Sequence, residues 1–153
     1  MNRKYKRYLS ESLQYNFENS PYHWITQVHN LYEQRIEFSL KKHGLDHSRI
    51  RVLSALKVMP QVSLSSLSEV LVIPISSTTK IVYRLQKEGL VNIYNCPLDA
   101  RVTRSELTEL GSVMVQKINE VTRIVSERSY NGIAPVHLER MLENLKHIFY
   151  KIK

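Results

Sequence analysis

Cysteine, tryptophan, glycine and proline are all scarce in this sequence of 153 residues, which holds one Cys, one Trp, four Gly and five Pro. A single cysteine excludes a disulfide framework within the chain and any cysteine-rich zinc module. The few glycines and prolines do not supply the many tight turns of an all-β fold. No apolar run approaches the ~18–20 residues of a membrane span, and the basic start leads into polar residues, unlike a signal peptide. We therefore expect a cytoplasmic protein with no membrane partner.

Acidic residues are outnumbered as well. The 22 Lys and Arg residues exceed the 14 Asp and Glu residues and give a formal net charge of +8. Such a basic chain suits a polyanionic partner, such as nucleic acid or an anionic membrane surface. With 42% hydrophobic residues, the composition is that of a globular protein. The length fits one domain over residues 1–153, which begins with a basic arm at 1–19.

The residue pattern predicts mostly helices, because apolar residues recur at spacings of three and four. Ser20 and Pro21 mark the start of the first helix and Gly44 its end. The predicted helices span 20–43, 47–59, 64–71 and 74–88, and two longer ones begin at Thr108 and near Pro135. Residues 90–95 and 101–107 are rich in β-formers, which predicts two strands joined by a turn at 96–100.

This order predicts a mainly α (α+β) winged helix-turn-helix over residues 45–107, with a two-stranded β-hairpin as the wing. Helices at 20–43 and 108–153 flank it and serve dimerisation. The fourth helix is the candidate recognition helix, because its outward face carries hydroxyls and cations and no acidic residue before Glu88. Hydroxyls allow close approach to bases and phosphates, and cations neutralise the DNA backbone. The candidate DNA-binding residues on this helix and the wing are Ser76, Ser77, Thr79, Lys80, Tyr83, Arg84, Lys87, Asp99, Arg101 and Arg104. A solvated surface face is the alternative interpretation.

Three segments together resemble the MarR family of bacterial transcription regulators. They are residues 64–71, residues 75–91, and Asp99-Ala100-Arg101 followed by the Leu-Thr-x-x-Gly pattern at 107–111. The resemblance is dense over residues 45–111, and the Asp-x-Arg and Leu-Thr-x-x-Gly pair is its most specific part. Two positions depart from the family's pattern. Ala100 stands where a second Arg is usual, which weakens the wing contacts, and Ser68 stands where Ala is usual, which we expect to matter little.

The resemblance implies a homodimer in which the first helix and the last two pair across a two-fold axis. The amount of apolar surface on these helices independently favours pairing, although they could also pack on their own chain. The implied partner is a pseudo-palindromic operator in double-stranded DNA. The resemblance also implies that Asp99 orients Arg101 at the wing tip.

Small ligands of the family, often phenols or aromatic carboxylates, bind between the first two helices and the fifth. The resemblance therefore makes a small aromatic acid or phenolic effector the candidate ligand here. Trp24, His29, Tyr32 and Arg35 of the first helix are the candidate contacts, because rings stack and a cation adds a charge-assisted hydrogen bond. The alternative is that Trp24 and Tyr32 are interface or core residues with His29 as their neighbour.

Catalytic motifs do not occur in the sequence, so we expect no enzyme and no cofactor. His43 and His47 have an i,i+4 spacing, but Gly44 interrupts the helix that would align them, and we expect surface histidines and no metal. Cys96 is expected to be structural, since thiolate activation needs nearby cations and only Arg101 is a candidate. The favoured function is a ligand-responsive DNA-binding transcription repressor. The alternatives are a winged-helix protein that binds nucleic acid without sequence specificity, as in nucleoid packing, and a protein-interaction module.

Overall fold

The computed structural model of the chain describes Tyr5, Tyr8 and residues 16–153, so most of the predicted N-terminal arm lies outside the described residues. Helices and a small antiparallel sheet make up this part of the chain. In order they are α1 (Pro21–Leu40), α2 (His47–Val58), β1 (Val62–Ser63), α3 (Leu64–Leu71), α4 (Ile75–Lys87), β2 (Val91–Cys96), β3 (Asp99–Leu107), α5 (Glu109–Tyr130) and α6 (Pro135–Ile152). The 3₁₀ helices η2 (Phe17–Asn19) and η3 (Lys41–His43) flank α1. The prediction of a mainly helical winged helix-turn-helix is confirmed.

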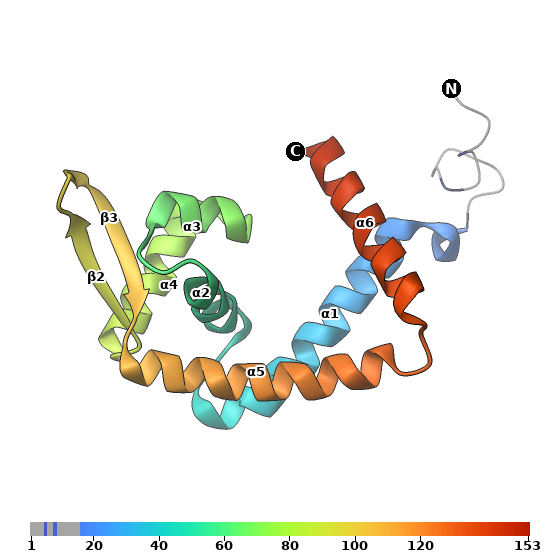
Figure 1. The fold of residues 1–153 in the computed structure, drawn as a ribbon, viewed down its shortest axis with the longest axis horizontal. Coiled ribbons are helices and arrows are strands. Elements are labelled where there is room, and N and C mark those ends of the chain that lie inside the picture. Colours follow the sequence, from blue (N-terminus) through green and yellow to red (C-terminus); the bar gives the residue numbers. More distant parts are fainter. Residues whose placement is uncertain (1–4, 6–7, 9–15) are drawn as a thin grey trace.

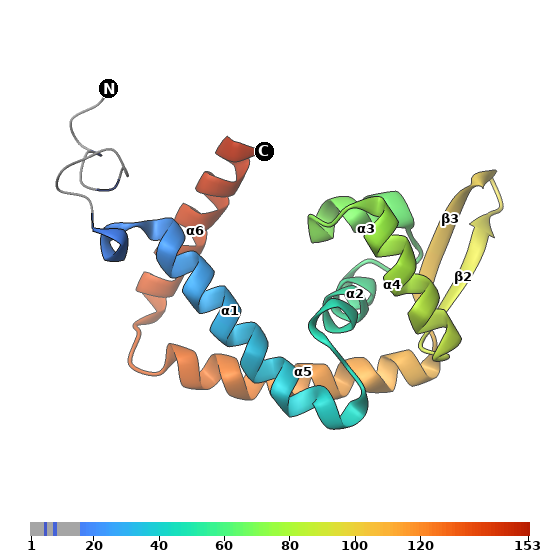
Figure 2. The same cartoon turned by 180° about the vertical axis from the view of Figure 1, so that it is seen from behind.

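The long helix α5 connects the two ends of the structure (Figure 1). At one end, α2, α3 and α4 pack together beside the β2–β3 hairpin, which projects as the wing. At the other end, α6 turns back from the end of α5, and α1 packs against α5, as the reverse view also shows (Figure 2). The winged-helix unit and helix α6 therefore lie toward opposite ends of α5.

Local sequence signals set the helix starts. The Ser63 hydroxyl accepts the backbone N–H of Ser66 at 3.1 Å, and the Thr108 hydroxyl accepts that of Gly111 at 2.9 Å. Each cap satisfies an N–H that has no partner within the helix. The observed α3 spans 64–71, as predicted.

The sheet has three strands in the order β1-β3-β2. The predicted hairpin is confirmed, with Val91 opposite Leu107 and an irregularity between Asn95 and Cys96 near the turn. The two-residue strand β1, in which Val62 pairs with Ser105, was not predicted. Two residues are too short to show a strand periodicity, so only the pairing with β3 reveals this strand.

The core lies mainly in the winged-helix unit. Leucines from α2, α3 and α4 are fully buried together, including Leu53, Leu67 and Leu85. Val82 of α4 and Ile118 of α5 belong to the same cluster. This packing fixes the buried side of α4 and so determines which of its residues face solvent.

The turn between α3 and α4 carries backbone strain, because Val72 adopts a left-handed conformation with φ of 53°. A β-branched residue is disfavoured there. The Ser68 hydroxyl donates to the carbonyl of Ile73 at 2.7 Å and so ties α3 to the far side of this turn. Ala could not form this bond, and the expectation that Ser at position 68 matters little stays a prediction.

A close joint connects the end of α4, the start of the wing and the start of α5. The Thr108 hydroxyl donates to the carbonyl of Gly89 at 2.7 Å. The backbone N–H of Thr108 donates to the carbonyl of Leu90 at 3.1 Å. Gly111 lies so close that a Cβ there would be 2.0 Å from the Leu90 oxygen. Only glycine fits this approach.

Helix α6 has no buried residue in the single chain. Its large apolar side chains are exposed, and they include Val136, Met141, Leu142, Leu145, Phe149, Tyr150 and Ile152. Helix α1 also exposes Ile25, Val28 and Leu31. None of the described helices is long and apolar enough to cross a membrane.

Candidate nucleic-acid interface

Helix α4 separates its residues onto two faces. Thr78, Val82 and Leu85 are buried against the core. The opposite, solvent-exposed face carries Ser76, Ser77, Lys80, Tyr83, Arg84 and Lys87. Thr79 is half-buried, and its hydroxyl donates to the carbonyl of Ile75 at 2.8 Å. Most of the predicted α4 residues thus share one accessible face, whereas the hydroxyl of Thr79 has a partner in its own helix.

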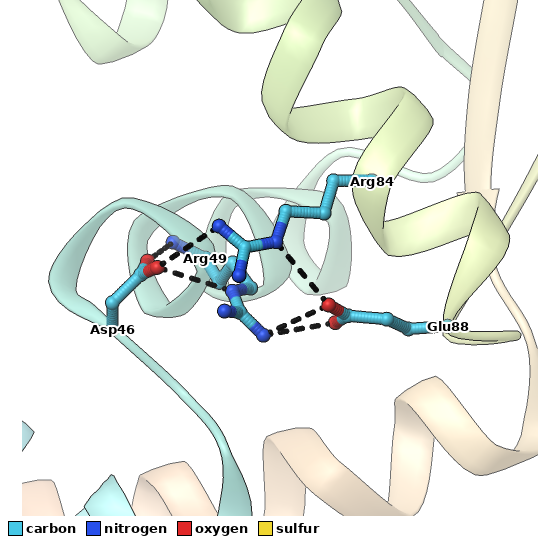
Figure 3. Close-up of polar contacts among 4 residues, drawn as sticks. All are labelled: Asp46, Arg49, Arg84 and Glu88. Atoms are coloured by element: carbon cyan, nitrogen blue, oxygen red, sulfur yellow. Dashed lines mark hydrogen bonds and ion pairs between the residues drawn. The ribbon is translucent and has the colours of Figure 1, made fainter.

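Arg84 differs from the other cations of α4, because it faces two carboxylates of its own chain (Figure 3). Its Nε lies 3.4 Å from Oε1 of Glu88, and its Nη1 lies 3.8 Å from Oδ2 of Asp46. Arg49 lies between the same two acids, 2.9 Å from Glu88 and 3.2 Å from Asp46. We call Asp46, Arg49, Arg84 and Glu88 the α2–α4 ion network. It attaches the recognition helix to the start of α2.

Asp46 is the N-cap of α2 as well as a member of this network. Its Oδ1 accepts the backbone N–H of Arg49 at 3.0 Å. Partial burial raises the pKa of Asp46, but the hydrogen bonds from Arg49 and the charges of Arg49 and Arg84 outweigh it, so the pKa lies below the ordinary value. The carboxylate is therefore ionised at neutral pH and faces Arg84 as an anion.

The wing tip brings together Asp99 and Arg101, as predicted. The backbone N–H of Arg101 donates to Oδ1 of Asp99 at 3.0 Å, and the guanidinium Nε lies 3.6 Å from the same oxygen. The Arg101 side chain is otherwise 95% exposed. A cation at the end of a thin hairpin has the shape needed to enter a narrow minor groove.

Arg104 lies further down the wing and has partners in the protein. Its Nη1 donates to the carbonyl of Gln61 at 2.7 Å, which links β3 to the loop before β1. A hydrogen bond from Arg104, helped by the backbone N–H groups of Leu98 and Asp99, lowers the pKa of the Cys96 thiol. The cation beside the buried Cys96 is thus Arg104, whereas we had considered Arg101.

In the part of the chain that the structure describes, the candidate ligand residues of α1 make separate contacts. The Trp24 indole donates to the carbonyl of Glu18 at 2.7 Å, and the Tyr32 hydroxyl lies 3.5 Å from the Ser126 hydroxyl on α5. Arg35 is exposed, and the His29 ring lies against that of His47. Tyr32 follows Trp24 by eight positions, which corresponds to about 12 Å along the helix.

Several residues that shape this interface were missed by sequence reasoning. Asp46, Arg49 and Glu88 carry the ion network, and Gln61 holds Arg104. The N-cap pattern of Asp46 ahead of an apolar helix is a signal that could have found it. Arg49 lies three residues after Asp46, and Glu88 lies four after Arg84, spacings that a helix brings together. The contacts between α2 and α4 and the contact of Arg104 with Gln61 join segments that are distant in sequence, and no local pattern marks those.

The recognition helix α4, packed against α2 and α3, and the wing with its exposed Arg101 define a winged helix-turn-helix DNA-binding protein. The model of the MarR family matches residues 45–103. The sequence is 36% identical over 136 residues to the HTH-type transcriptional repressor IacR of Pseudomonas putida, covering 89% of this chain and 81% of that protein. The chain belongs to the MarR family, and it is a DNA-binding transcription regulator. This membership agrees with the expectation that it is not an enzyme.

Solved structures show the same fold. A MarR-family transcriptional regulator from Silicibacter pomeroyi superposes with a TM-score of 0.82 at 20% identity, over 90% of this chain and 93% of that one. BpsR of Bordetella bronchiseptica superposes with a TM-score of 0.77 at 18% identity, over 88% and 96%. The DNA binding of BpsR is regulated by 6-hydroxynicotinic acid.

Proposed function

We propose that the chain is a homodimeric repressor that recognises a pseudo-palindromic operator through α4 and the wing. The observation that carries this proposal is the exposed face of α4, where two serine hydroxyls precede Lys80 and Lys87. Small hydroxyls and Lys80 suit contact with base edges, and Lys87 suits contact with phosphate. The 36% identity to a protein named as a repressor supports repression over activation.

Dimerisation is supported by the apolar surface of the terminal helices. A helix such as α6, with no buried residue and a row of exposed apolar side chains, is stable in water when a partner covers it. A two-fold dimer presents two copies of α4 to successive major grooves. The half-sites of the operator are then about 10–10.5 bp apart, or a multiple of that spacing.

A small aromatic acid or phenol is the proposed effector. Support comes from BpsR, whose DNA binding 6-hydroxynicotinic acid regulates, and from the aromatic and basic residues Trp24, His29, Tyr32 and Arg35 on α1. The coupling between effector and DNA is expected at about 1–3 kcal/mol and must be reciprocal. Because Trp24 is the only tryptophan in the chain, its fluorescence reports binding near it.

The test compares the DNA upstream of the regulator's own gene with a scrambled duplex of equal length. Fluorescence anisotropy is expected to show a preference of about 10³ or more for the cognate DNA, and sedimentation is expected to give a dimer of two 18.0 kDa chains. Equal affinity for both duplexes would favour the alternative of binding without sequence specificity. A stable monomer that still protected a palindromic site would contradict the dimer.

A further inference from the structure

Two histidines and a glutamate meet where α1 approaches the start of α2, away from the DNA-binding face. His29 and Glu33 are one helical turn apart on α1, and His47 is the first residue of α2. Oε2 of Glu33 contacts Nδ1 of His47, and the rings of His29 and His47 lie edge to face with centroids 5.9 Å apart. One possible ligand atom from each of the three residues lies within 4.8 Å of the other two.

This donor set has the chemistry of a transition-metal site. Imidazole nitrogens and a carboxylate oxygen suit Zn²⁺ and its first-row neighbours, whereas Mg²⁺ and Ca²⁺ prefer oxygen ligands alone. Zn–N bonds of about 2.0–2.1 Å place tetrahedral donors roughly 3.3 Å apart. Glu33 and His47 already face each other, so an ion between them requires their contacting atoms to separate and the exposed His29 side chain to turn toward them.

A pairwise contact between Glu33 and His47 does not account for the place of His29. The His29 ring lies outside that pair and meets the His47 ring edge to face. A metal ion binds the lone pair of a neutral imidazole, so one ion can use both rings together with the Glu33 carboxylate. The combination of all three side chains is therefore better explained by a cation at their centre.

We propose that His29, Glu33 and His47 bind a divalent transition-metal ion, of which Zn²⁺ fits best, and that the ion joins α1 to the start of the winged-helix unit. Three protein ligands leave a coordination position for water or for the carboxylate of a bound acid. The expectation of no metal site rested on the pair His43 and His47, whereas the structure pairs His47 with residues of α1.

The test uses the full chain without a histidine tag, freed of metal by chelation. Isothermal titration with ZnCl₂ at pH 7.5 is expected to give one ion per chain, and Co²⁺ is expected to produce the visible absorption of a low-symmetry site. His29→Ala and Glu33→Gln are each expected to weaken Zn²⁺ binding by about tenfold or more. His43→Ala is the matched control, because His43 precedes α2 in η3 and is not one of the three donors.

The readouts separate this proposal from the proposed function, because metal binding is measured without DNA. Relative to each protein's own value in EDTA, Zn²⁺ is also expected to raise the melting temperature of the wild type and not that of Glu33→Gln. Failure of the wild type to bind Zn²⁺, or equal binding by the wild type and both variants, would overturn the proposal. Loss of binding in His43→Ala alone would place the ion elsewhere and overturn it as well.

Discussion

The carboxylate of Asp99 contacts both the backbone N–H and the guanidinium of Arg101 at the wing tip. One carboxylate oxygen accepts the backbone N–H at 3.0 Å and lies 3.6 Å from the guanidinium Nε. A side chain that is already oriented loses less conformational entropy when it enters a groove. Position 100 is Ala, so we expect Arg101 to be the main cation of the tip.

Substitutions at these two positions are expected to weaken operator binding in the same direction despite opposite changes in charge. Arg101→Ala is expected to cost about 1–3 kcal/mol of binding free energy, and Asp99→Ala a smaller amount. Simple electrostatics predicts that Asp99→Ala binds more tightly, because it makes the protein more positive. Anisotropy titrations decide between the two, with unchanged melting temperatures as the control. Tighter binding by Asp99→Ala would show that the aspartate does not orient Arg101.

Two lysines of α4 are expected to separate affinity from specificity. Lys87→Ala removes a proposed phosphate contact, so cognate and random duplexes should weaken equally and the salt slope should fall by roughly one. Lys80→Ala is expected to cost ~1–3 kcal/mol on the cognate site and less on random DNA. Titrations at several salt concentrations measure both quantities. Equal weakening by Lys80→Ala on both duplexes would make Lys80 a backbone contact.

Asp46 is expected to contribute a pH-dependent part of the stability. Its pKa in the folded chain lies below the ordinary value of 3.8, so its ionised form stabilises the fold above pH 3.8. This contribution is lost as the pH falls through the lowered pKa. Melting temperatures of the wild type and Asp46→Asn should differ slightly at neutral pH and converge in acid. Asn keeps the capping oxygen, whereas Asp46→Ala also loses the cap, at about 1 kcal/mol. A difference that grew in acid would contradict this assignment.

Removal of α6 is expected to abolish both dimerisation and operator binding. A chain that ends before Ala134 lacks all the exposed apolar residues of α6, and sedimentation should report a monomer. Leu145→Glu in the full chain is a milder form of the test, because it places a charge on the apolar side of the helix. Glu143→Lys is its control, since position 143 is about 200° away around the helix. A dimer that survived the truncation would place the interface elsewhere.

Gly111→Ala is expected to destabilise the fold by about 1–3 kcal/mol, the usual cost of overpacking. The new Cβ would lie 2.0 Å from the carbonyl oxygen of Leu90, which is backbone and cannot move aside alone. Thermal unfolding measures the loss, and Ser112→Ala at the next, exposed position is the control. An unchanged melting temperature would show that α5 can shift away from β2.

Features set by local sequence were predicted well. The Ser63 cap fixed the start of α3, the Thr108 cap fixed the start of α5, and Asp99 and Arg101 are only two residues apart. The wing and the order of helices followed from periodicity and turn residues over short segments. Each of these signals acts within one helical turn or one hairpin, so no tertiary knowledge is needed.

Features set by distant pairs were missed or incompletely predicted. The exposed position of Arg84 on α4 followed from helical periodicity, but its contact with Asp46 depends on how α2 packs against α4. The same is true of Arg104 with Gln61 and of Glu33 with His47, which are 43 and 14 residues apart. Such contacts arise only after the helices have packed.

Helix α5 transmits motion as a rigid rod, because its first turn is fixed at the joint of Gly89, Leu90, Thr108 and Gly111. The 22 residues of α5 correspond to a rod of about 33 Å. Its first turn is bonded directly behind the end of α4 and the start of β2, with no room for slippage. If α5 tilted by about 5° about its C-terminal end, where α6 begins, its N-terminal end would move by roughly 3 Å. Helix α4, which is bonded to that N-terminal end, would move with it. Small rearrangements among the terminal helices are in this way enlarged at the DNA surface.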